Sequence, residues 1–205
     1  MKLNAEKDTV TAARYRVKSY PTILVLQKDG TEIDRVVGYY RAPEFMAKVE
    51  DYLAGRNTLA AMAAQEPDSA ESATFLSALA DRYFEHALYP DARTRYLAVT
   101  RIDPKNASGL TDDALYSLAR MSRKDKDYAA ARGYAQRILD DYKDADTYKP
   151  AILELAGNWR RDGKLTNARR IYLDYAKRYP KDEDAPWAAE QADSCAVRLK
   201  RGEGV

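Results

Sequence analysis

The feature that most constrains this fold is a pattern of small and large apolar residues that recurs three times after Thr74. Its anchors are Ala92, Ala131 and Ala168, which lie 39 and 37 residues apart (131 − 92 and 168 − 131). Around each anchor, apolar residues recur at intervals of three and four, which is typical of one face of an amphipathic helix. Small residues let two helices approach closely, and large ones fill the space beside them. The pattern therefore predicts three helical hairpins that stack into a solenoid.

Each predicted hairpin contributes seven or eight matching positions. The first has Leu76, Leu79, Ala80, Tyr83, Ala92, Tyr96, Val99 and Pro104. The second has Leu115, Leu118, Ala119, Ser122, Ala131, Ala135 and Ile138. The third has Ile152, Leu155, Ala156, Trp159, Ala168, Tyr172, Tyr175 and Pro180. These units resemble tetratricopeptide repeats of a divergent bacterial kind, whose period of about 34 residues is shorter, so slightly longer turns are expected here.

A further helix is expected after Asp184-Ala185-Pro186, as a cap on the third hairpin,. Its buried stripe is predicted to comprise Trp187, Ala188, Ala192, Cys195 and Leu199. The following residues, Arg201–Val205, are expected to fray.

Ahead of the repeats, Val17–Gly38 predicts a β-hairpin. Pro21 precedes an apolar first strand near Thr22–Gln27, where a proline at the strand entrance need not donate a ladder hydrogen bond. Asp29-Gly30 is a strong turn signal, and a second, alternating strand follows near Ile33–Val37.

Helices are predicted on both sides of this hairpin. Asp8 or Thr9 can cap a helix near Val10–Tyr15, and Pro43 can begin an amphipathic helix that ends at Gly55. The apolar stripe of the helix that begins at Pro43 is predicted to comprise Phe45, Met46, Val49, Tyr52 and Leu53. Thr58–Ala73 is predicted to be helical to about Gln65 and then to turn. The expected organisation is a module at residues 1–55, a helical linker at 56–72 and the repeats with their cap at 73–205.

The order V-K-S-Y-P-T, strand, D-G, strand, G-Y and helix resembles the C-terminal half of a thioredoxin domain, over about Lys2–Gly55. The resemblance implies a cis peptide bond between Tyr20 and Pro21, and a surface at these two residues that binds an extended peptide. It also matches Met1–Ala5 to a strand whose partners belong to the other half of the domain. The redox motif of the family, Cys-x-x-Cys, would lie upstream of Met1. The predicted fold class is α+β, a truncated thioredoxin-like module followed by an α-helical solenoid.

Composition limits the classes of function and of site that the sequence suggests. The chain has 205 residues with a net charge of +2, which gives no electrostatic argument for nucleic acid,. No apolar run approaches the length of a membrane span and no signal peptide opens the chain, so the compartment, cytoplasm or bacterial envelope, stays open. One cysteine, Cys195, lies at a core position, and one histidine, His86, is expected at a helix end. We predict no catalytic residue, metal site or cofactor in this sequence.

The predicted groove of the repeats supplies the candidate binding residues. Positions expected to face it are Ser77, Asp81, Phe84, Tyr116, Arg120, Arg123, Leu153 and Arg160. The three arginines among them suit carboxylates of a partner, because guanidinium groups pair with carboxylates in a bidentate manner. The predicted peptide-binding set is Tyr20, Pro21, Tyr116, Arg120, Arg123 and Arg160.

These sequence features predict two alternative functions. The first is a protein–protein interaction scaffold that binds a peptide or partner protein in the solenoid groove. The second is the client-binding part of a thioredoxin-like disulfide oxidoreductase whose Cys-x-x-Cys half lies upstream. A homodimer formed through the incomplete sheet edge is a third expectation.

Overall fold

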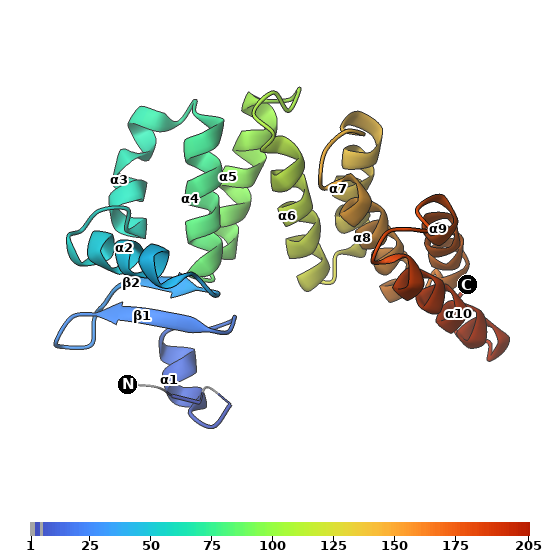
Figure 1. Ribbon diagram of the computed structural model, residues 1–205, viewed down its shortest axis with the longest axis horizontal. Coiled ribbons are helices and arrows are strands. Elements are labelled where there is room, and N and C mark those ends of the chain that lie inside the picture. The colour runs from blue at the N-terminus through green and yellow to red at the C-terminus, as the bar shows by residue number, and fades with distance from the viewer. Residues whose placement is uncertain (1–2, 5) are drawn as a thin grey trace. The chain divides into compact units, whose positions relative to one another are not determined.

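The computed structural model describes residues 3–4 and 6–205 and divides into two compact units. The first unit ends at Ile102, and the second runs from Asp103 to Val205. In chain order, a two-stranded antiparallel hairpin is followed by a series of packed helices, as predicted (Figure 1). None of the described helices is long and apolar enough to cross a bilayer.

The first unit opens with four elements, α1 (Thr9–Arg14), β1 (Thr22–Leu26), β2 (Glu32–Val37) and α2 (Ala42–Leu53). Asp8 caps α1, because its Oδ1 accepts a hydrogen bond of 3.0 Å from the backbone N–H of Thr11,. Pro43 lies in the first turn of α2, where a missing N–H costs nothing,. Gly55 follows the helix end with φ of +70°, a conformation that glycine adopts without strain,. The structure confirms these predicted helix signals.

The two strands of the hairpin pair in a regular antiparallel register with one irregularity. Thr22 lies opposite Val37 and Val25 opposite Asp34, after which a bulge shifts the pairing at Leu26. The bulge re-aims the residues beyond it, as such insertions commonly do.

Helix α2 covers the hairpin with an apolar cluster. Val25, Val36 and Tyr52 are buried, and Ile33, Phe45 and Val49 pack against them. The prediction that Met46 and Leu53 complete this stripe is wrong, since they are 50% and 62% exposed. The small sheet offers one narrow face, so a helix of this length buries only the side chains that point directly at it.

Three more helices complete the first unit, α3 (Leu59–Ser69), α4 (Ala73–Glu85) and α5 (Tyr89–Ile102). Thr58 caps α3 through a hydrogen bond to its Oγ1 from Ala61 N. The predicted end of this helix at Gln65 is wrong, because the helix continues past Pro67 to Ser69. Pro67 lacks an N–H and so removes one bond from the last turn without ending the helix there.

The second unit consists of five helices within its described residues, α6 (Thr111–Lys124), α7 (Tyr128–Asp141), α8 (Tyr148–Arg161), α9 (Leu165–Arg178) and α10 (Ala185–Lys200). With α4 and α5 of the first unit they give the three predicted hairpins and the final helix. The anchor residues Ala92, Ala131 and Ala168 are all fully buried. The close helix approach inferred from these small residues is therefore present.

The turn inside each hairpin repeats as well. Ala87, Lys126 and Gly163 have positive φ values of 56°, 62° and 75°, with the same spacing as the alanines (126 − 87 = 39; 163 − 126 = 37). After each of them, a backbone N–H donates a 2.9 Å hydrogen bond to the carbonyl five residues earlier: Leu88 to Tyr83, Asp127 to Ser122 and Lys164 to Trp159. This is a Schellman closure of the first helix of each hairpin. Backbone geometry thus repeats with the period seen in the sequence.

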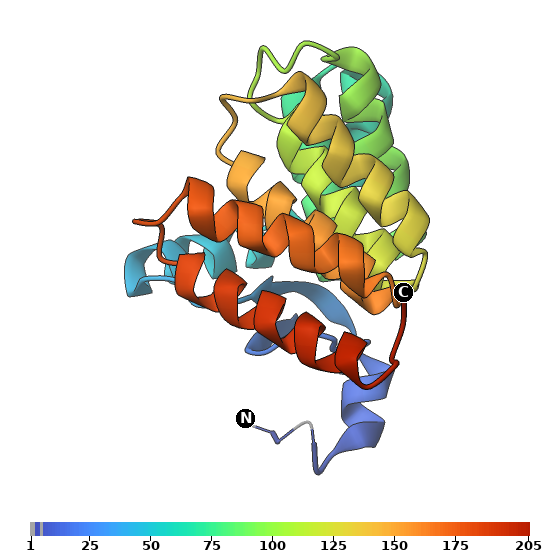
Figure 2. The ribbon, with the colours of Figure 1, turned by 90° about the vertical axis from the view of Figure 1, so that its right-hand side faces the viewer.

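Helix α10 packs along α9 at the end of the second unit (Figure 2). Ala188, Ala192 and Cys195 are fully buried in the contact, as predicted. Trp187 is the exception, because it is 43% exposed, with its ring nearly perpendicular to that of Tyr172.

Both ends of the described chain differ from expectation. The tail is not frayed, because Val205 N donates to Gly163 O at 2.9 Å and Val205 O accepts from Thr166 N at 3.3 Å. Leu3 and Asn4 belong to no strand. The other positions of that expected strand, residues 1, 2 and 5, lie outside the described residues.

Candidate functional sites

The thioredoxin-like surface centres on the peptide bond between Tyr20 and Pro21, which is cis as the resemblance implied. Pro21 O accepts a hydrogen bond of 2.9 Å from Gly38 N, so the start of β1 and the end of β2 are joined here. Tyr20 is 66% exposed, and Tyr39, the residue after Gly38, is 92% exposed. Two aromatic side chains therefore stand in solvent at this end of the hairpin.

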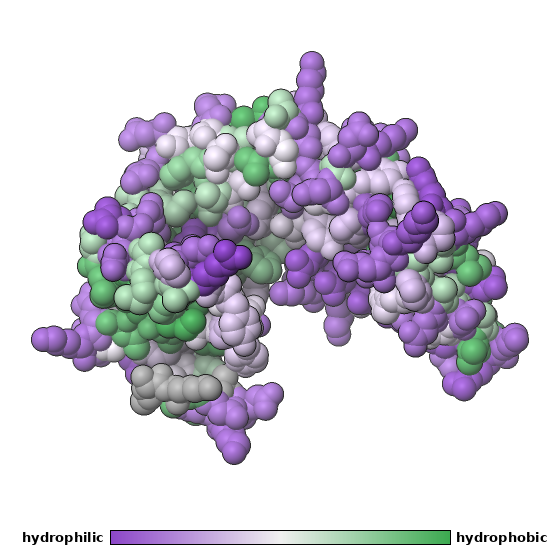
Figure 3. Space-filling view, in the orientation of Figure 1, coloured by the Kyte–Doolittle hydropathy of each residue, from purple (hydrophilic) through white to green (hydrophobic). Residues whose placement is uncertain are grey.

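One edge of β1 has no strand partner among the described residues, since the sheet there has two strands. Pairing of Pro21 with Gly38 fixes the alternation, so the backbone groups of Thr22 and Leu24 point away from β2,. Ile23 and Leu26 are 37% and 38% exposed, and apolar surface gathers over the hairpin and α2 in Figure 3. Exposed strand edges of this kind accept further strands.

The other side of the hairpin is closed by buried charges. Six residues form a network that we call the ionic clasp: Glu32, Asp34 and Arg35 from β2, and Arg82, Glu85 and His86 from α4 and its end. Asp34 and Arg35 are 0% and 1% exposed. The clasp joins the thioredoxin-like hairpin to the first helical hairpin within the first unit.

Asp34 is the centre of the clasp. It is ion-paired with Arg82, accepts a hydrogen bond of 2.6 Å from Leu59 N, and lies 2.9 Å from His86 Nε2. Burial opposes ionisation of this carboxyl, but the hydrogen bond from His86 and the charge of Arg82 outweigh it and lower its pKa from 3.8 to about 2,. Asp34 is therefore a stable buried anion at neutral pH.

Both arginines of the clasp also donate hydrogen bonds to backbone carbonyls. Arg35 pairs with the Glu32 carboxylate through Nε and Nη2, both at 2.7 Å, and its Nη2 also donates to Tyr15 O at 2.7 Å. Arg82 Nη1 also donates to Arg35 O at 3.3 Å. That contact covers a carbonyl on the β2 edge of the sheet, whereas the β1 edge has no strand partner among the described residues.

The second unit holds a groove of about 520 Å³ that we call the arginine groove. Its lining comes from four helices and includes Tyr116, Arg123, Leu153, Arg160, Arg161 and Trp187. Three of the predicted site residues, Tyr116, Arg123 and Arg160, are thereby brought together. Tyr20 and Pro21 belong to the first unit and form a separate candidate site.

Intramolecular bonds already engage some of these side chains. Arg123 Nε pairs with Glu154 Oε1 at 2.7 Å, and Arg160 Nη1 donates to Gln191 Oε1 at 2.5 Å. Arg120, the remaining predicted site residue, does not line the groove, and its guanidinium carbon lies 5.9 Å from the centre of the Tyr116 ring.

Predicted groove positions in the first hairpin are occupied by other contacts. Ser77 is buried, so the expectation that it faces a groove is wrong. Asp81 accepts a hydrogen bond of 2.5 Å from Tyr96 Oη, across the two helices of its own hairpin.

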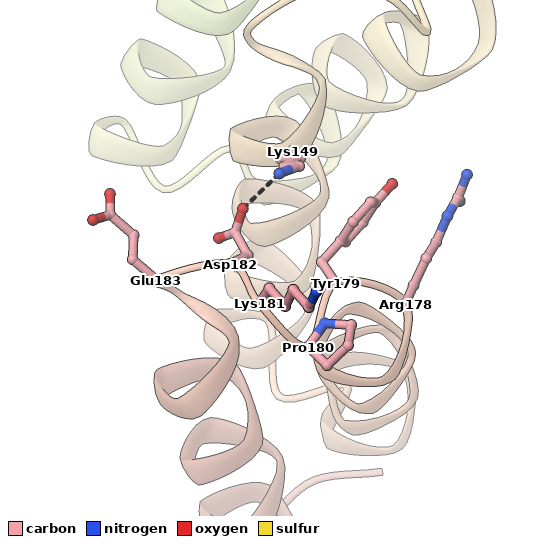
Figure 4. Close-up of a pocket in the computed structure, with 7 residues that line it drawn as sticks. All are labelled: Lys149, Arg178, Tyr179, Pro180, Lys181, Asp182 and Glu183. Carbon is pink, nitrogen blue, oxygen red and sulfur yellow. Dashed lines mark hydrogen bonds and ion pairs between the residues drawn. The ribbon is translucent and has the colours of Figure 1, made fainter.

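A shallower hollow of about 630 Å³ lies at the turn between α9 and α10 (Figure 4). Lys149 and Arg178 lie 5.1 Å and 5.3 Å from the centre of the Tyr179 ring, as cation–π contacts,. Lys149 also pairs with Asp182 at 2.6 Å. Lys149, Arg178 and Asp182 are thus already engaged by contacts within the chain.

Three carboxylates, those of Asp112, Asp113 and Asp146, lie within 4.8 Å of one another. Asp112 already accepts hydrogen bonds from Asn106 Nδ2 at 2.6 Å and Thr147 Oγ1 at 2.7 Å. This cluster therefore belongs to the polar network at the start of α6.

Sequence reasoning missed the clasp and several residues that line the groove, among them Arg161 and Trp187. His86 was placed correctly at a helix end, where it follows α4, but its acid partner Asp34 lies 52 residues upstream. No local spacing links such residues. For Arg161, the usable signal was its position four residues after Gly157, which places both on one helix face.

The N-terminal segment is similar to known proteins. Residues 2–53 match the family of the thioredoxin-like domain. Curated thioredoxins of Staphylococcus aureus strains N315, COL and USA300 are each 43% identical over 51 residues, which is 25% of this chain and 47% of the relative. The chain thus spans about half the length of the curated relatives that it matches. It carries a thioredoxin-like domain sequence at its N-terminus, followed by a series of packed helices.

Proposed function

We propose that this chain is a protein–protein interaction scaffold, in which the arginine groove binds a peptide segment of a partner protein. The groove itself carries the proposal, because it combines an exposed tryptophan with three arginines, which together come from three helices. Tryptophan, tyrosine and arginine are the residues that dominate binding energy at protein interfaces. Tetratricopeptide-like repeats, which we propose for the three hairpins, suit this role because in proteins of this kind neighbouring repeats build one extended surface.

A peptide array tests the proposal. Random nine-residue peptides are probed with the full chain, with a variant carrying Arg160→Glu and Trp187→Ala, and with an Arg169→Glu control. Arg169 is an exposed residue of α9 that does not line the groove. We expect peptides that bind the parent chain and the control but not the groove variant. Equal binding to all three proteins would contradict the groove assignment.

A second candidate function is thiol–disulfide exchange within a larger protein that serves bacterial redox homeostasis. It is favoured by the thioredoxin-like match and by the exposed Tyr20 next to Pro21 at the start of β1. The single cysteine does not serve this chemistry, because Cys195 is fully buried and burial raises the pKa of its thiol,. We therefore propose that a Cys-x-x-Cys segment upstream would supply the reacting thiols and that Tyr20-Pro21 would hold the client.

The mass and N-terminal peptide of the endogenous protein test this second candidate. A species heavier than 23.2 kDa that carries an upstream Cys-x-x-Cys and reduces insulin would support it. A protein of 23.2 kDa that begins at Met1 would exclude it.

The unpaired edge of β1 supports a proposal about assembly, in which two copies join through this strand. Leu24→Pro removes a backbone donor that points to the open edge and leaves the pairing with β2 intact,. Light scattering should then show a dimer for the parent chain and a monomer for the variant. A monomeric parent chain at all concentrations would exclude the dimer.

A further inference from the structure

The floor of the arginine groove has an arrangement that no sequence pattern assigned. Gly157 lies in the interior of α8, where glycine is unfavourable compared with alanine,. A Cβ atom at this position would lie 2.7 Å from Arg161 Nη1 and 3.5 Å from Tyr172 Oη. The guanidinium of Arg161 therefore folds back over one helical turn and occupies the space that a side chain at position 157 would fill.

Arg161 differs from the other arginines of the groove in its electrostatic surroundings. Arg123 is paired with Glu154, and Arg160 is held by the amide of Gln191. No ion pair links Arg161 to any other residue in the described part of the chain, and its side chain is exposed. Its positive charge is available to a ligand.

Neighbouring groups suit a carboxylate at this point. Tyr172 is 1% exposed, and its hydroxyl borders the same space over Gly157 as the Arg161 guanidinium. Burial raises the pKa of the Tyr172 hydroxyl, which therefore remains a donor at neutral pH,. A carboxylate can thus accept hydrogen bonds from a guanidinium and a phenol together, and charge-assisted bonds of this kind are the stronger class.

An apolar contact lies next to this polar corner. Trp187 meets Tyr172 edge to face, with ring centres 5.7 Å apart and planes at 87°. Its indole is 43% exposed and lines the groove, as does Leu153. Two acids also line it, Glu154 and Asp184, of which Glu154 is already paired. Asp184 would repel a second negative charge, so the groove favours one carboxylate.

We infer that the arginine groove selects peptides in which a single glutamate or aspartate adjoins a large apolar residue. The carboxylate binds Arg161 and the Tyr172 hydroxyl, and the apolar side chain packs on the exposed indole of Trp187. This inference rests on the proposed binding function of the groove and adds the chemistry of the ligand.

The test uses four labelled nonapeptides of otherwise identical sequence with the full chain. Their central pairs are Glu-Leu, Gln-Leu, Glu-Gly and Lys-Leu, and fluorescence anisotropy measures Kd for each. We expect the Glu-Leu peptide to bind at least about tenfold more tightly than the other three, as a charge-assisted hydrogen bond contributes. Arg161→Gln should remove the preference for glutamate over glutamine, and the Arg169→Gln control should retain it.

A second readout separates folding from recognition. Trp159→Phe leaves Trp187 as the reporter tryptophan, and its emission should change on addition of the Glu-Leu peptide. Binding of all four peptides with similar Kd would overturn the inference and leave the binding function in place. Absence of binding by every peptide, here and on the random array, would overturn both.

Discussion

Replacing Asp34 with asparagine would remove the negative charge at the centre of the ionic clasp. The folded chain holds the pKa of this carboxyl at about 2, against 3.8 for an unperturbed group. The difference of about 1.8 pH units corresponds to about 2 kcal/mol of stabilisation when Asp34 is ionised. A buried ion pair that loses one partner typically costs about 3–5 kcal/mol. Glu85 would still pair with Arg82, so we expect a loss of about 2–3 kcal/mol for the first unit.

The contribution of Asp34 to the free energy of unfolding depends on pH with a definite sign. Because the pKa of Asp34 is lower in the folded than in the unfolded state, its contribution is complete above about pH 4,. It is lost as the pH falls from about 4 to about 2, where the folded-state carboxyl becomes protonated. The Asp34→Asn protein should lack this part of the acid-induced loss, so the difference between the two proteins should shrink over the same range.

Urea unfolding and hydrogen exchange provide the assay. A loss of about 2 kcal/mol should speed amide exchange of residues 22–37 by about 30-fold, while exchange in α8 and α9 stays unchanged. Asp51→Asn is the matched control, since Asp51 also has a lowered pKa, from hydrogen bonds with Asn57 and Arg56, but lies at the surface. Surface pairs contribute little. If Asp34→Asn cost no more than Asp51→Asn, or left the hairpin exchange unchanged, the reasoning would be refuted.

Three further predictions concern the helices. Ala131→Leu should destabilise the second unit by about 1–3 kcal/mol in urea unfolding, because the fully buried site has no room, whereas Ala129→Leu on the exposed face of α7 should be tolerated,. Tyr142→Phe should cost about 1 kcal/mol through loss of the 2.8 Å hydrogen bond to Pro104 O; an unchanged denaturation midpoint would contradict this,. Cys195 should react with a thiol reagent only on unfolding, so labelling of the native chain within minutes would show that its buried site opens.

The helical part of this fold could be predicted because its information is local. Ala92, Ala131 and Ala168 mark where helices must approach, and amphipathic spacing around them fixes which faces are buried,. The β-hairpin could be predicted for the same reason, from Pro21 before its first strand and Gly30 in its turn.

The clasp could not be predicted in this way. A charged residue in an alternating strand is ordinarily assigned to solvent, yet Asp34 and Arg35 are buried. Their burial depends on Arg82 and His86, about 50 residues further along the chain, and no short-range pattern encodes such a pairing. Likewise, the exposure of Trp187 depends on how α10 rotates against α9, which periodicity does not specify.

The clasp also has a consequence for the order in which the protein is made. Arg82 is synthesised 48 residues after Asp34, which at about 5–20 residues per second is a delay of roughly 2–10 s,. During that interval the carboxylate and guanidinium of β2 lack the partners that α4 supplies, and a lone two-stranded hairpin is marginal on its own. The hairpin is thus expected to reach its final structure only after α4 has emerged. A ribosome-bound chain stopped before α4 should present an open sheet to chaperones, and one stopped after Ile102 should not.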